Sequence, residues 1–405
     1  MNSKKLFHRI FSGISTTEFA VEYWDKEIIQ YGNKSPKFVL YLKDKDVCNT
    51  LFSNLSLNVG EAYTSGAIDI QGDLQKFLQL AYTVDPRTFD LTWAEKMKIT
   101  YMHLRQRNTL KRSKSNIAHH YDLGNDFFSL WLGREMAYSC AYFQTPDDDI
   151  DTAQRQKFDH ICKKLQLKEG EMLIDIGCGW GGLASYAAQR YGVKVLGITL
   201  SKAQKELADK RISELGLKES VKIELMDYRE IPLNSYFDKV VSIGMLEHVG
   251  KENFHKYFSI ISRILKKGGV GLVQSIGHVV EHPVTPWIRK YIFPGMYLPT
   301  LDNMAKPMGR FELNITDVEV LRLHYALTLD KWLYAYENNI VRIREMYDEQ
   351  FVKMWRLYLN VCCVSFRYGE TCLWQVQFTK GLNNTLPLTR NYLYTSSVLD
   401  QIDKL

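Results

Sequence analysis

The stretch LIDIGCGWGGLASYAAQRYG, residues 173–192, carries the residue types and spacing best suited to chemistry. Its glycines at 177, 179 and 182 match the pattern of a loop that joins a strand to a helix and holds a nucleotide. Glycine lets the backbone turn tightly and approach a ligand without a Cβ in the way. The amides at a helix N-terminus also attract negative charge. The loop therefore predicts a dinucleotide or another adenosine-bearing ligand.

Acidic residues after the neighbouring strands distinguish the candidate ligands. A dinucleotide site of this type has an acid about 20 residues further on, which binds the ribose hydroxyls. Residues 198–201 at that position read ITLS, and no acid follows until Glu206. Asp175 can face an ammonium group, and Asp227 can approach an adenine amine, although a surface or capping role explains either acid taken alone. Together they favour S-adenosylmethionine; an oxidoreductase remains an alternative that requires NAD to bind instead.

Strand-length apolar runs alternate with amphipathic helical stretches from about residue 172. The expected strands are MLIDI, VKVLGI, VKIEL, FDKVVSI and GVGLVQSI, and LASYAAQRYG and SKAQKELADKRISELG are helical patterns between them. Regular alternation predicts parallel strands with crossover helices, hence an α/β doubly wound sheet. Ligands of such sheets bind at the carboxyl ends of the strands.

The flanking regions have other patterns. Residues 1–105 mix short apolar runs such as FVLYL with turn-rich stretches, which predicts a small mixed domain. The basic stretch RQRNTLKRSKS follows, either as a solvated linker or as a contact for phosphate headgroups. After Ile276, a proline-rich apolar segment is either an irregular packed loop or a lid over an apolar substrate. We expect an aromatic-rich helix at about 329–366 and a last strand and turn at 372–381.

Length and composition indicate a globular protein with two domains, or one domain with large additions. The chain has 405 residues, 45% of them apolar and 24% charged, which excludes global disorder. Seven cysteines, without a C-x-x-C pair, predict reduced thiols. No run approaches the roughly 20 apolar residues of a spanning helix, and no signal peptide begins the chain, so we expect a cytosolic protein. The net charge of +6 favours an anionic partner, either nucleic acid or an anionic bilayer.

Several motifs, taken with the glycine loop, identify a family resemblance. HHYDLGNDFFSLWLG, MAYSCAYF, IGMLEHVG, FPGMYLP and LWQVQF occur in order between about Ile117 and Gly381. This set closely resembles the cyclopropane-fatty-acid synthases of the phospholipid-modifying methyltransferase family. GEAYTSGAIDIQGDL resembles the added domain of the bacterial full-length members. The resemblance implies a seven-stranded class I methyltransferase sheet with a smaller N-terminal domain.

The resemblance also implies the division of the chain. We expect an N-terminal lipid-docking or dimerisation domain at 1–105 and a basic linker at 106–116. The methyltransferase domain would follow at 117–405, with an acyl-binding lid at about 278–325.

The cofactor implied is S-adenosylmethionine. Tyr138 and Ser139 are expected at its methionine end, and Cys178 is expected to contribute its backbone rather than a nucleophile. With Asp175 included, the expected cofactor-binding residues are Tyr138, Ser139, Asp175, Gly177, Cys178, Gly179, Thr199, Leu200, Ser201, Lys202, Ala203, Gln204, Asp227, Tyr228 and Arg229.

The reaction implied is methylene transfer to cis double bonds of unsaturated phospholipid acyl chains. A proton must leave the new methyl group before the ring closes, and the resemblance implies a bound bicarbonate as its acceptor. The residues implied around bicarbonate are Cys140 and Ile276 through their backbones, Glu247, Tyr325, and a histidine beside the fifth strand.

This chain departs from the family at that histidine, because the usual His-Thr-Ile-Gly reads QSIG, with Gln274 in the histidine position. Glutamine can hydrogen-bond to bicarbonate but cannot carry a proton at neutral pH. His278 and His248 are candidates to compensate, and a structural role is the alternative for each.

Two further groups of residues have simpler interpretations. Cys362 matches a position assigned as an active-site cysteine in relatives, but a thiolate has no role in attack by an alkene, so we favour packing in the acyl channel. His119 and His120 point apart on a helix and have no third ligand at zinc spacing, so we expect no metal.

The resemblance makes unsaturated phospholipids at the membrane surface the expected partner, with no nucleic acid and with a homodimer as an alternative use of the N-terminal domain. It implies a cytoplasmic enzyme at the inner face of the membrane. The alternatives are a methyltransferase that makes methyl-branched lipids or methylates a small amine, and a non-catalytic lipid-binding protein.

Overall fold

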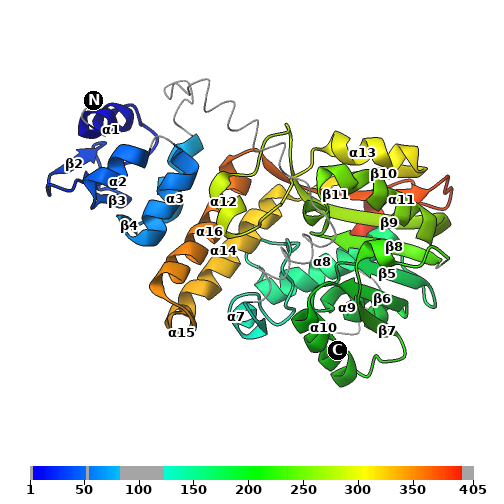
Figure 1. Ribbon diagram of the computed structural model, residues 1–405. Helices are drawn as coiled ribbons and strands as arrows, with labels where there is room; N and C mark the ends of the chain where they lie inside the picture. Colours follow the sequence, from blue (N-terminus) through cyan, green and yellow to red (C-terminus); the bar gives the residue numbers. More distant parts are fainter. Residues whose placement is uncertain (1–2, 52–53, 83–122, 235, 395–405) are drawn as a thin grey trace. The chain divides into compact units, whose positions relative to one another are not determined.

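The computed structural model describes residues 3–51, 54–82, 123–234 and 236–394 (Figure 1). The chain divides into two compact units, and each is assembled from separate segments. One comprises residues 1–107, 278–298 and 325–372, and the other comprises 108–277, 299–324 and 373–405. We call them the helical unit and the sheet unit.

The sheet unit contains a seven-stranded sheet in the order β10-β11-β9-β8-β5-β6-β7 (Figure 1). The ladders that join β5 to β6, β6 to β7, β5 to β8 and β8 to β9 are parallel, whereas β10 pairs with β11 antiparallel. The strands are β5 (Met172–Ile176), β6 (Lys194–Thr199), β7 (Val221–Leu225), β8 (Phe237–Ile243), β9 (Leu265–His278), β10 (Leu313–Val320) and β11 (Thr371–Lys380). The α/β fold class and the five expected parallel strands are confirmed.

Strand β10 was not assigned from the sequence. Its residues LNITDVEV are mostly exposed or half-buried, because it lies at one end of the sheet and pairs only with β11. A strand at this position needs little apolar surface, so its pattern is weak.

Helices connect the strands of the sheet unit as the alternating pattern predicts. They are α7 (Asn125–Ser129), α8 (Ile150–Leu165), α9 (Gly182–Tyr191), α10 (Lys202–Glu214), α11 (Phe254–Ile264) and α13 (Leu301–Arg310), with single turns η4 (Tyr228–Glu230), η5 (Leu246–His248), η6 (Lys251–Asn253) and η7 (Arg390–Leu393). Helix α8 begins where the Asp149 side chain accepts a hydrogen bond from the Thr152 amide. Ser201 caps α10 in the same way through the Gln204 amide.

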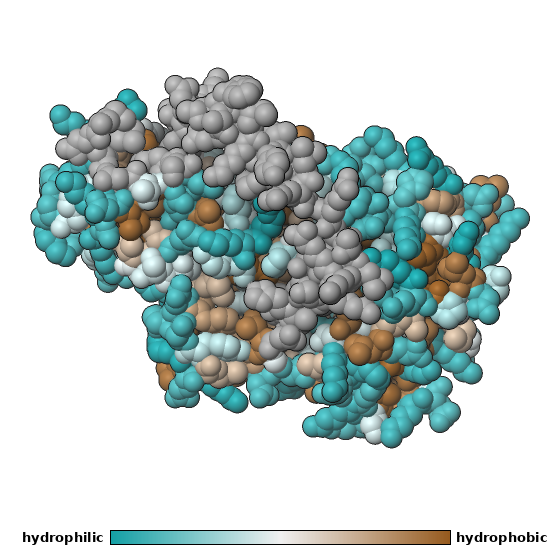
Figure 2. All heavy atoms as spheres, in the orientation of Figure 1, coloured by the Kyte–Doolittle hydropathy of each residue, from teal (hydrophilic) through white to brown (hydrophobic). Residues whose placement is uncertain are grey.

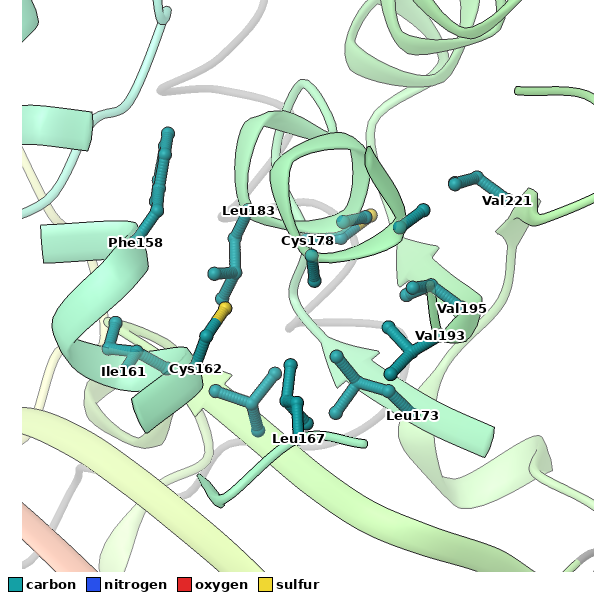
Figure 3. Close-up of a cluster of buried hydrophobic side chains, with 14 of the residues drawn as sticks. Phe158, Ile161, Cys162, Leu167, Leu173, Cys178, Leu183, Val193, Val195 and Val221 are labelled. Atoms are coloured by element: carbon teal, nitrogen blue, oxygen red, sulfur yellow. The ribbon is translucent and has the colours of Figure 1, made fainter. Parts of the chain in front are cut away.

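Helices α8 and α9 pack against the strands through one buried apolar cluster (Figure 3). Phe158 and Cys162 of α8, Leu183 of α9, Leu173 of β5 and Val195 of β6 all belong to this cluster, and Cys162 lies next to Leu183 in the view. All five side chains are at most 6% exposed. This packing holds α8 rigidly beside the end of β5.

The helical unit has a four-stranded sheet in the order β2-β1-β3-β4, which fits the small mixed domain expected at the N-terminus. Its strands are β1 (Phe19–Glu22), β2 (Ile28–Tyr31), β3 (Phe38–Leu42) and β4 (Ile68–Gly72), and the N-terminal helices are α1 (Ser3–Ser12), α2 (Lys45–Thr50), α3 (Leu55–Ser65), α4 (Leu74–Gln79) and η2 (Leu80–Tyr82). Later parts of the chain add α12 (Pro286–Tyr291), α14 (Arg322–Asn338, of which residues from 325 belong here), α15 (Ile340–Met346) and α16 (Glu349–Tyr368).

The expected aromatic-rich helix at about 329–366 is helical but consists of three helices, α14, α15 and α16. Asn339 separates the first two and donates from its side chain to the Ala335 carbonyl. Asp348 begins α16 by accepting from the Phe351 amide. Short polar side chains of this kind bond to the local backbone and favour helix ends.

The C-terminal helices pack on the N-terminal ones within the helical unit. Helix α16 contacts α3 and α4, and α12 contacts α3, where a Cβ at Gly60 would lie 2.3 Å from the Trp287 ring. The Lys290 ammonium donates to Glu61 at 2.6 Å. Residues 278–298 and 325–372 therefore group with the N-terminal residues, whereas the sequence-based boundaries placed them in the domain at 117–405. The docking and lid roles stay predictions, and the expected linker at 106–116 lies outside the described residues.

None of the helices in the described ranges is long and apolar enough to cross a membrane. On the face shown in Figure 2, hydrophilic residues cover most of the described surface and surround smaller apolar groups.

Candidate active site

A cleft opens in the sheet unit at the carboxyl ends of β5, β6, β7 and β8. It amounts to about 1150 Å³ of atom-free space, including the solvent at its mouth. Twelve of the fifteen residues expected to bind the cofactor line it: Tyr138, Ser139, Asp175, Gly177, Cys178, Gly179, Thr199, Leu200, Gln204, Asp227, Tyr228 and Arg229. The structure thus gathers segments that are up to 91 residues apart in the sequence, from Tyr138 to Arg229.

The glycine loop leaves β5 in a backbone conformation that glycine tolerates best. Gly177 has φ +85°, and a Cβ there would lie 3.0 Å from Cγ of Met245. Cys178 follows, and its Sγ packs toward β6, where a Cβ at Gly197 would approach it to 2.9 Å. Burial raises the pKa of the Cys178 thiol well above its ordinary value. This thiol is therefore not a nucleophile, and the backbone of the loop is what faces the cleft.

Hydrogen bonds between near neighbours organise the segment after β6. The Thr199 hydroxyl donates to Oε1 of Gln204 at 2.7 Å, so the Gln204 amide nitrogen remains available toward the cleft. The three expected residues that do not line the cleft have other contacts. Ser201 caps α10, Lys202 lies 3.7 Å from Glu206 at the surface, and the Ala203 carbonyl accepts from Asn125 at 3.0 Å.

Asp227 and Arg229 form a buried ion pair at the end of β7. Nε and one terminal nitrogen of Arg229 lie 2.8 Å from Oδ1 and Oδ2 of Asp227. The Arg229 amide donates to the same carboxylate at 2.9 Å. This geometry fixes the plane of the carboxylate, which is 1% exposed and borders the cleft.

Glu247 and Gln274 are two buried polar side chains of the same unit, and we call them, together with the Ile276 amide, the inner carboxyl region. Oε1 of Glu247 accepts from the Ile276 amide at 2.6 Å, whereas Oε2 is buried and has no hydrogen-bond partner among the described residues. Burial raises the pKa of Glu247 to about 7. Gln274 is 1% exposed, and its Oε1 accepts from Nε2 of Gln375 at 3.0 Å. Because Oε1 is occupied, the Gln274 amide presents its nitrogen as the remaining polar group.

The backbone groups of Ile276 already have partners inside the protein. Its amide donates to Glu247 and its carbonyl accepts from the Ser275 hydroxyl at 2.9 Å. Cys140 is buried, and its Sγ donates to the Ala141 carbonyl at 3.1 Å. Glu247 therefore occupies the Ile276 amide, one of the backbone groups of the residue that the resemblance implied beside bicarbonate.

Tyr325 and Cys362 belong to the helical unit, so the contacts above do not include them. Tyr325 is buried and stacks on Phe366 with ring centroids 4.5 Å apart. Burial raises the pKa of the Cys362 thiol to about 12. A thiol in that state does not act as a nucleophile at neutral pH, in line with the packing role favoured for Cys362.

The two histidines considered for the proton relay are both neutral at pH 7. Burial lowers the pKa of His248, which lines the cleft, to about 4. The pKa of His278 is also about 4, through burial and the neighbouring His282, whose ring lies 3.5 Å away. His278 belongs to the helical unit. Either ring could accept a proton only as a weak base.

Residues that the sequence interpretation missed also line the cleft. Lys157 of α8 is 3% exposed and donates to the Ser139 hydroxyl at 3.0 Å. Trp180 lines the cleft as well and donates from its indole nitrogen to Asn125 at 2.7 Å. A sequence signal existed for Lys157, because it lies four residues after Ala153 and four before Ile161, on the apolar face of an amphipathic helix.

No group of three or more His, Cys, Asp or Glu side chains within the described ranges is arranged to hold a metal ion. His119 and His120 lie outside those ranges. The expectation that the protein binds no metal stays a prediction.

Comparisons with known protein families agree with this geometry. The family model for mycolic acid cyclopropane synthetase matches residues 108–376, which is more than half of the chain. A second model, for a domain of unknown function, matches residues 6–90.

Individual relatives cover nearly the whole chain. A probable fatty acid methyltransferase of Pseudomonas putida is 36% identical over 383 residues, which are 92% of this chain and 95% of the relative. The cyclopropane-fatty-acyl-phospholipid synthase of Escherichia coli K12 is 36% identical over 359 residues, 88% of this chain and 92% of the relative.

Solved structures of similar proteins match about two thirds of the chain. The cyclopropane synthase MmaA2 of Mycobacterium tuberculosis has a TM-score of 0.64 at 32% identity and covers 67% of this chain, with all of its own chain matched. Mycolic acid cyclopropane synthase CmaA1, complexed with SAH and CTAB, has a TM-score of 0.63 at 32% identity and covers 66% of this chain and 98% of its own. The chain belongs to the mycolic acid cyclopropane synthetase family and is an S-adenosylmethionine-dependent methyltransferase.

Proposed function

We propose that this enzyme transfers a methylene group from S-adenosylmethionine to cis double bonds of unsaturated phospholipid acyl chains, which forms cyclopropane fatty acids. The observation that carries the proposal is the buried Glu247 carboxyl group with one unpartnered oxygen. It lies in sequence between Met245 and His248, which both line the cofactor cleft. In the transfer of a methyl group to an amine, the Glu247 carboxyl group would have no role, because the amine attacks through its lone pair and needs no buried proton acceptor.

The relatives support a lipid substrate. The E. coli relative is named for fatty-acyl phospholipids, the P. putida relative for fatty acids and the mycobacterial structures for mycolic acids. We infer the phospholipid class for this chain because the E. coli relative covers 88% of it, including the N-terminal part.

We infer that the inner carboxyl region binds a small anion such as bicarbonate, because it contains two buried polar side chains that can donate hydrogen bonds. With a pKa of about 7, Glu247 carries a proton in a large part of the molecules at neutral pH, so Oε2 can donate to an anion. The Gln274 amide nitrogen is a second donor, because Gln375 holds its oxygen. We infer that these two side chains would hold bicarbonate, with Cys140 and Tyr325 as further expected contacts. Bicarbonate, when bound, would supply a proton acceptor.

The cleft residues would orient the reactants and exclude water. An alkene is a poor nucleophile, so its π bond must be aligned with the sulfonium methyl group in a dry site. Methyl transfer leaves positive charge on the acyl carbon, and aromatic faces stabilise such charge. Tyr138, Phe158, Trp180 and Tyr228 line the cleft and are candidates for this role.

We further infer a cytoplasmic enzyme that associates peripherally with the inner face of the membrane. An insoluble substrate requires contact with the bilayer, and the net charge of +6 favours an anionic lipid surface. The N-terminal domain would dock on the membrane or form a homodimer. These assignments rest on the proposed substrate class.

Incubation of the pure protein with unsaturated phospholipid vesicles and S-adenosylmethionine tests the proposal. We expect acyl chains that gain CH₂ by mass spectrometry, with loss of the alkene signal and new cyclopropane signals by NMR. A Glu206→Gln variant, changed at an exposed residue of α10, serves as the active control. A saturated methyl branch, methylation of an added amine, or lipid binding without any product would each contradict the proposal in favour of the corresponding alternative.

A further inference from the structure

Lys157 is a buried cation in the wall of the cofactor cleft. It lies on α8 at 3% exposure and lines the cleft together with Ser139 and Asp175. A lysine ammonium is rarely buried to this degree without a carboxylate partner, because an uncompensated charge costs much free energy in a low-dielectric interior. The ammonium group therefore needs partners outside its own helix that compensate its charge.

The hydrogen bonds of Lys157 fix its ammonium group in place. Nζ donates to Oε1 of Gln154 at 2.6 Å and to the Ser139 hydroxyl at 3.0 Å. Gln154 is fully buried, and its amide nitrogen donates to the Ala137 and Ser139 carbonyls at 3.1 and 3.0 Å. Gln154 thus joins the ammonium rigidly to the loop that carries Tyr138 and Ser139. An ammonium has three N–H donors, and the described residues provide hydrogen-bond acceptors for two.

Asp175 places an opposite charge in the same cleft. It is the fourth residue of β5 and is 2% exposed, and its carboxylate has no hydrogen bond to any residue in the described part of the chain. Its charge and that of Lys157 stabilise each other, but no ion pair joins them. The cleft wall therefore presents a cation and an anion that are separated from one another and incompletely satisfied by the protein.

We propose that the Lys157 ammonium binds the α-carboxylate of S-adenosylmethionine, opposite the Asp175 carboxylate, which is already expected from the sequence to face the α-ammonium. A zwitterion placed between two separated opposite charges satisfies both at once. Burial lowers the pKa of Lys157 to about 7 and raises that of Asp175 to about 7, so each charged form would gain from a partner of opposite sign. The inference depends on the cofactor and not on the acyl substrate.

Binding measurements with two ligands test this assignment independently of any lipid product. S-adenosylhomocysteine has the amino-acid end, and 5′-methylthioadenosine lacks it. We expect Lys157→Met to weaken the binding of S-adenosylhomocysteine by about 10- to 100-fold, which is the effect of losing a hydrogen bond to a charged group. Binding of methylthioadenosine should change by less than about 2-fold, since it makes no such bond. Isothermal titration calorimetry measures both.

Two further variants separate ligand binding from a structural role. Lys157→Gln keeps donors for Ser139 and Gln154 but has no charge, so we expect it to bind S-adenosylhomocysteine as weakly as Lys157→Met. Lys163→Met removes a lysine of the same helix that pairs with Asp159 at 2.8 Å and does not line the cleft, and it should bind both ligands normally. Thermal melting checks that each variant is folded.

Three results would overturn the inference. The first is that Lys157→Gln binds S-adenosylhomocysteine with normal affinity, and the second is that the Lys157 variants bind both ligands equally weakly. The third is that Lys157→Met binds S-adenosylhomocysteine with unchanged affinity. The first two indicate that the lysine only supports the Ser139 loop. Since no acyl product is measured, none of these results bears on the proposed cyclopropane chemistry.

Discussion

The part of the cleft expected to hold the nucleoside, here called the nucleoside end, and the inner carboxyl region use hydrogen bonds of different range along the chain. At the nucleoside end, Thr199 binds Gln204 and Arg229 binds Asp227, so each contact joins residues at most five positions apart. In the inner carboxyl region, Glu247 binds the Ile276 amide and Gln274 binds Gln375, which are 29 and 101 positions apart. The first region depends on local turns and helix ends, whereas the second requires β8, β9 and β11 to be assembled.

The two regions also differ in the chemistry for which their side chains are suited. The nucleoside end presents fixed dipoles and a paired carboxylate, which suit binding. The inner carboxyl region contains a carboxyl group whose pKa is raised to about 7 by burial, which suits proton transfer near neutral pH. We therefore expect substitutions in the first region to change cofactor affinity and those in the second to change turnover.

The largest expected effect is that of Glu247→Gln. The amide can still accept from Ile276 but cannot exchange a proton at neutral pH, so we expect turnover on phospholipid vesicles to fall by about 100-fold or more. S-adenosylhomocysteine should bind with normal affinity in calorimetry. A fully active variant would refute the role of this carboxyl group.

The raised pKa of Glu247 should also be visible in stability. In the folded protein the carboxyl group binds its proton up to about pH 7, compared with an ordinary value of 4.5. Its stabilising contribution is therefore complete below about pH 4.5 and is lost as pH rises toward 7. Relative to Glu247→Gln, the free energy of unfolding of the wild type should decrease by about 3 kcal/mol across this window.

Urea denaturation at a series of pH values measures that difference. Comparison with the variant removes the contribution of Asp175, which titrates in the same range in both proteins. A difference that does not vary between pH 4.5 and 7 would mean that Glu247 is not buried as described.

Gly177→Ala tests the nucleoside end. The residue has φ +85°, and the added methyl group would lie 3.0 Å from Met245, so the loop must shift. We expect about 10-fold weaker binding of S-adenosylhomocysteine, with less change in turnover at saturating cofactor. Gly170→Ala, also at positive φ but with open space around the Cβ, controls for backbone strain alone. If the two variants bind equally well, the close approach at Gly177 has no importance for binding.

The smallest effect is expected for Gln274→His. One nitrogen of a neutral imidazole can accept a hydrogen bond from Nε2 of Gln375, and the other can donate one to the bound anion. Turnover should therefore stay within about 3-fold of the wild type. Gln274→Leu removes both hydrogen bonds and should lower turnover more, with an increased requirement for added bicarbonate. Loss of activity in Gln274→His together with normal activity in Gln274→Leu would show that no donor is needed there.

Much of the sheet unit could be predicted from local patterns. The five parallel strands and the helices after them follow from apolar periodicity, and the glycine loop and Asp175 were assigned from residue type and spacing. Strand β10 escaped prediction because an end strand with one partner needs few apolar residues. The single helix expected near 329–366 proved to be three, because Asn339 and Asp348 end and begin helices through local hydrogen bonds.

The sequence by itself determined the fold class, the family and most of the expected residues that line the cleft, because these depend on periodicity, glycine conformation and contacts between near neighbours. Only the tertiary structure decided that Gln375 orients Gln274, that Glu247 occupies the Ile276 amide, and that Lys157 faces the cleft beside Asp175. Burial gives these groups their pKa values and their partners, and burial results from packing between elements distant in the chain. The physical reason is that the desolvation of a side chain depends on all the groups that surround it in the folded protein. Residue type and spacing, in contrast, describe only its neighbours along the sequence.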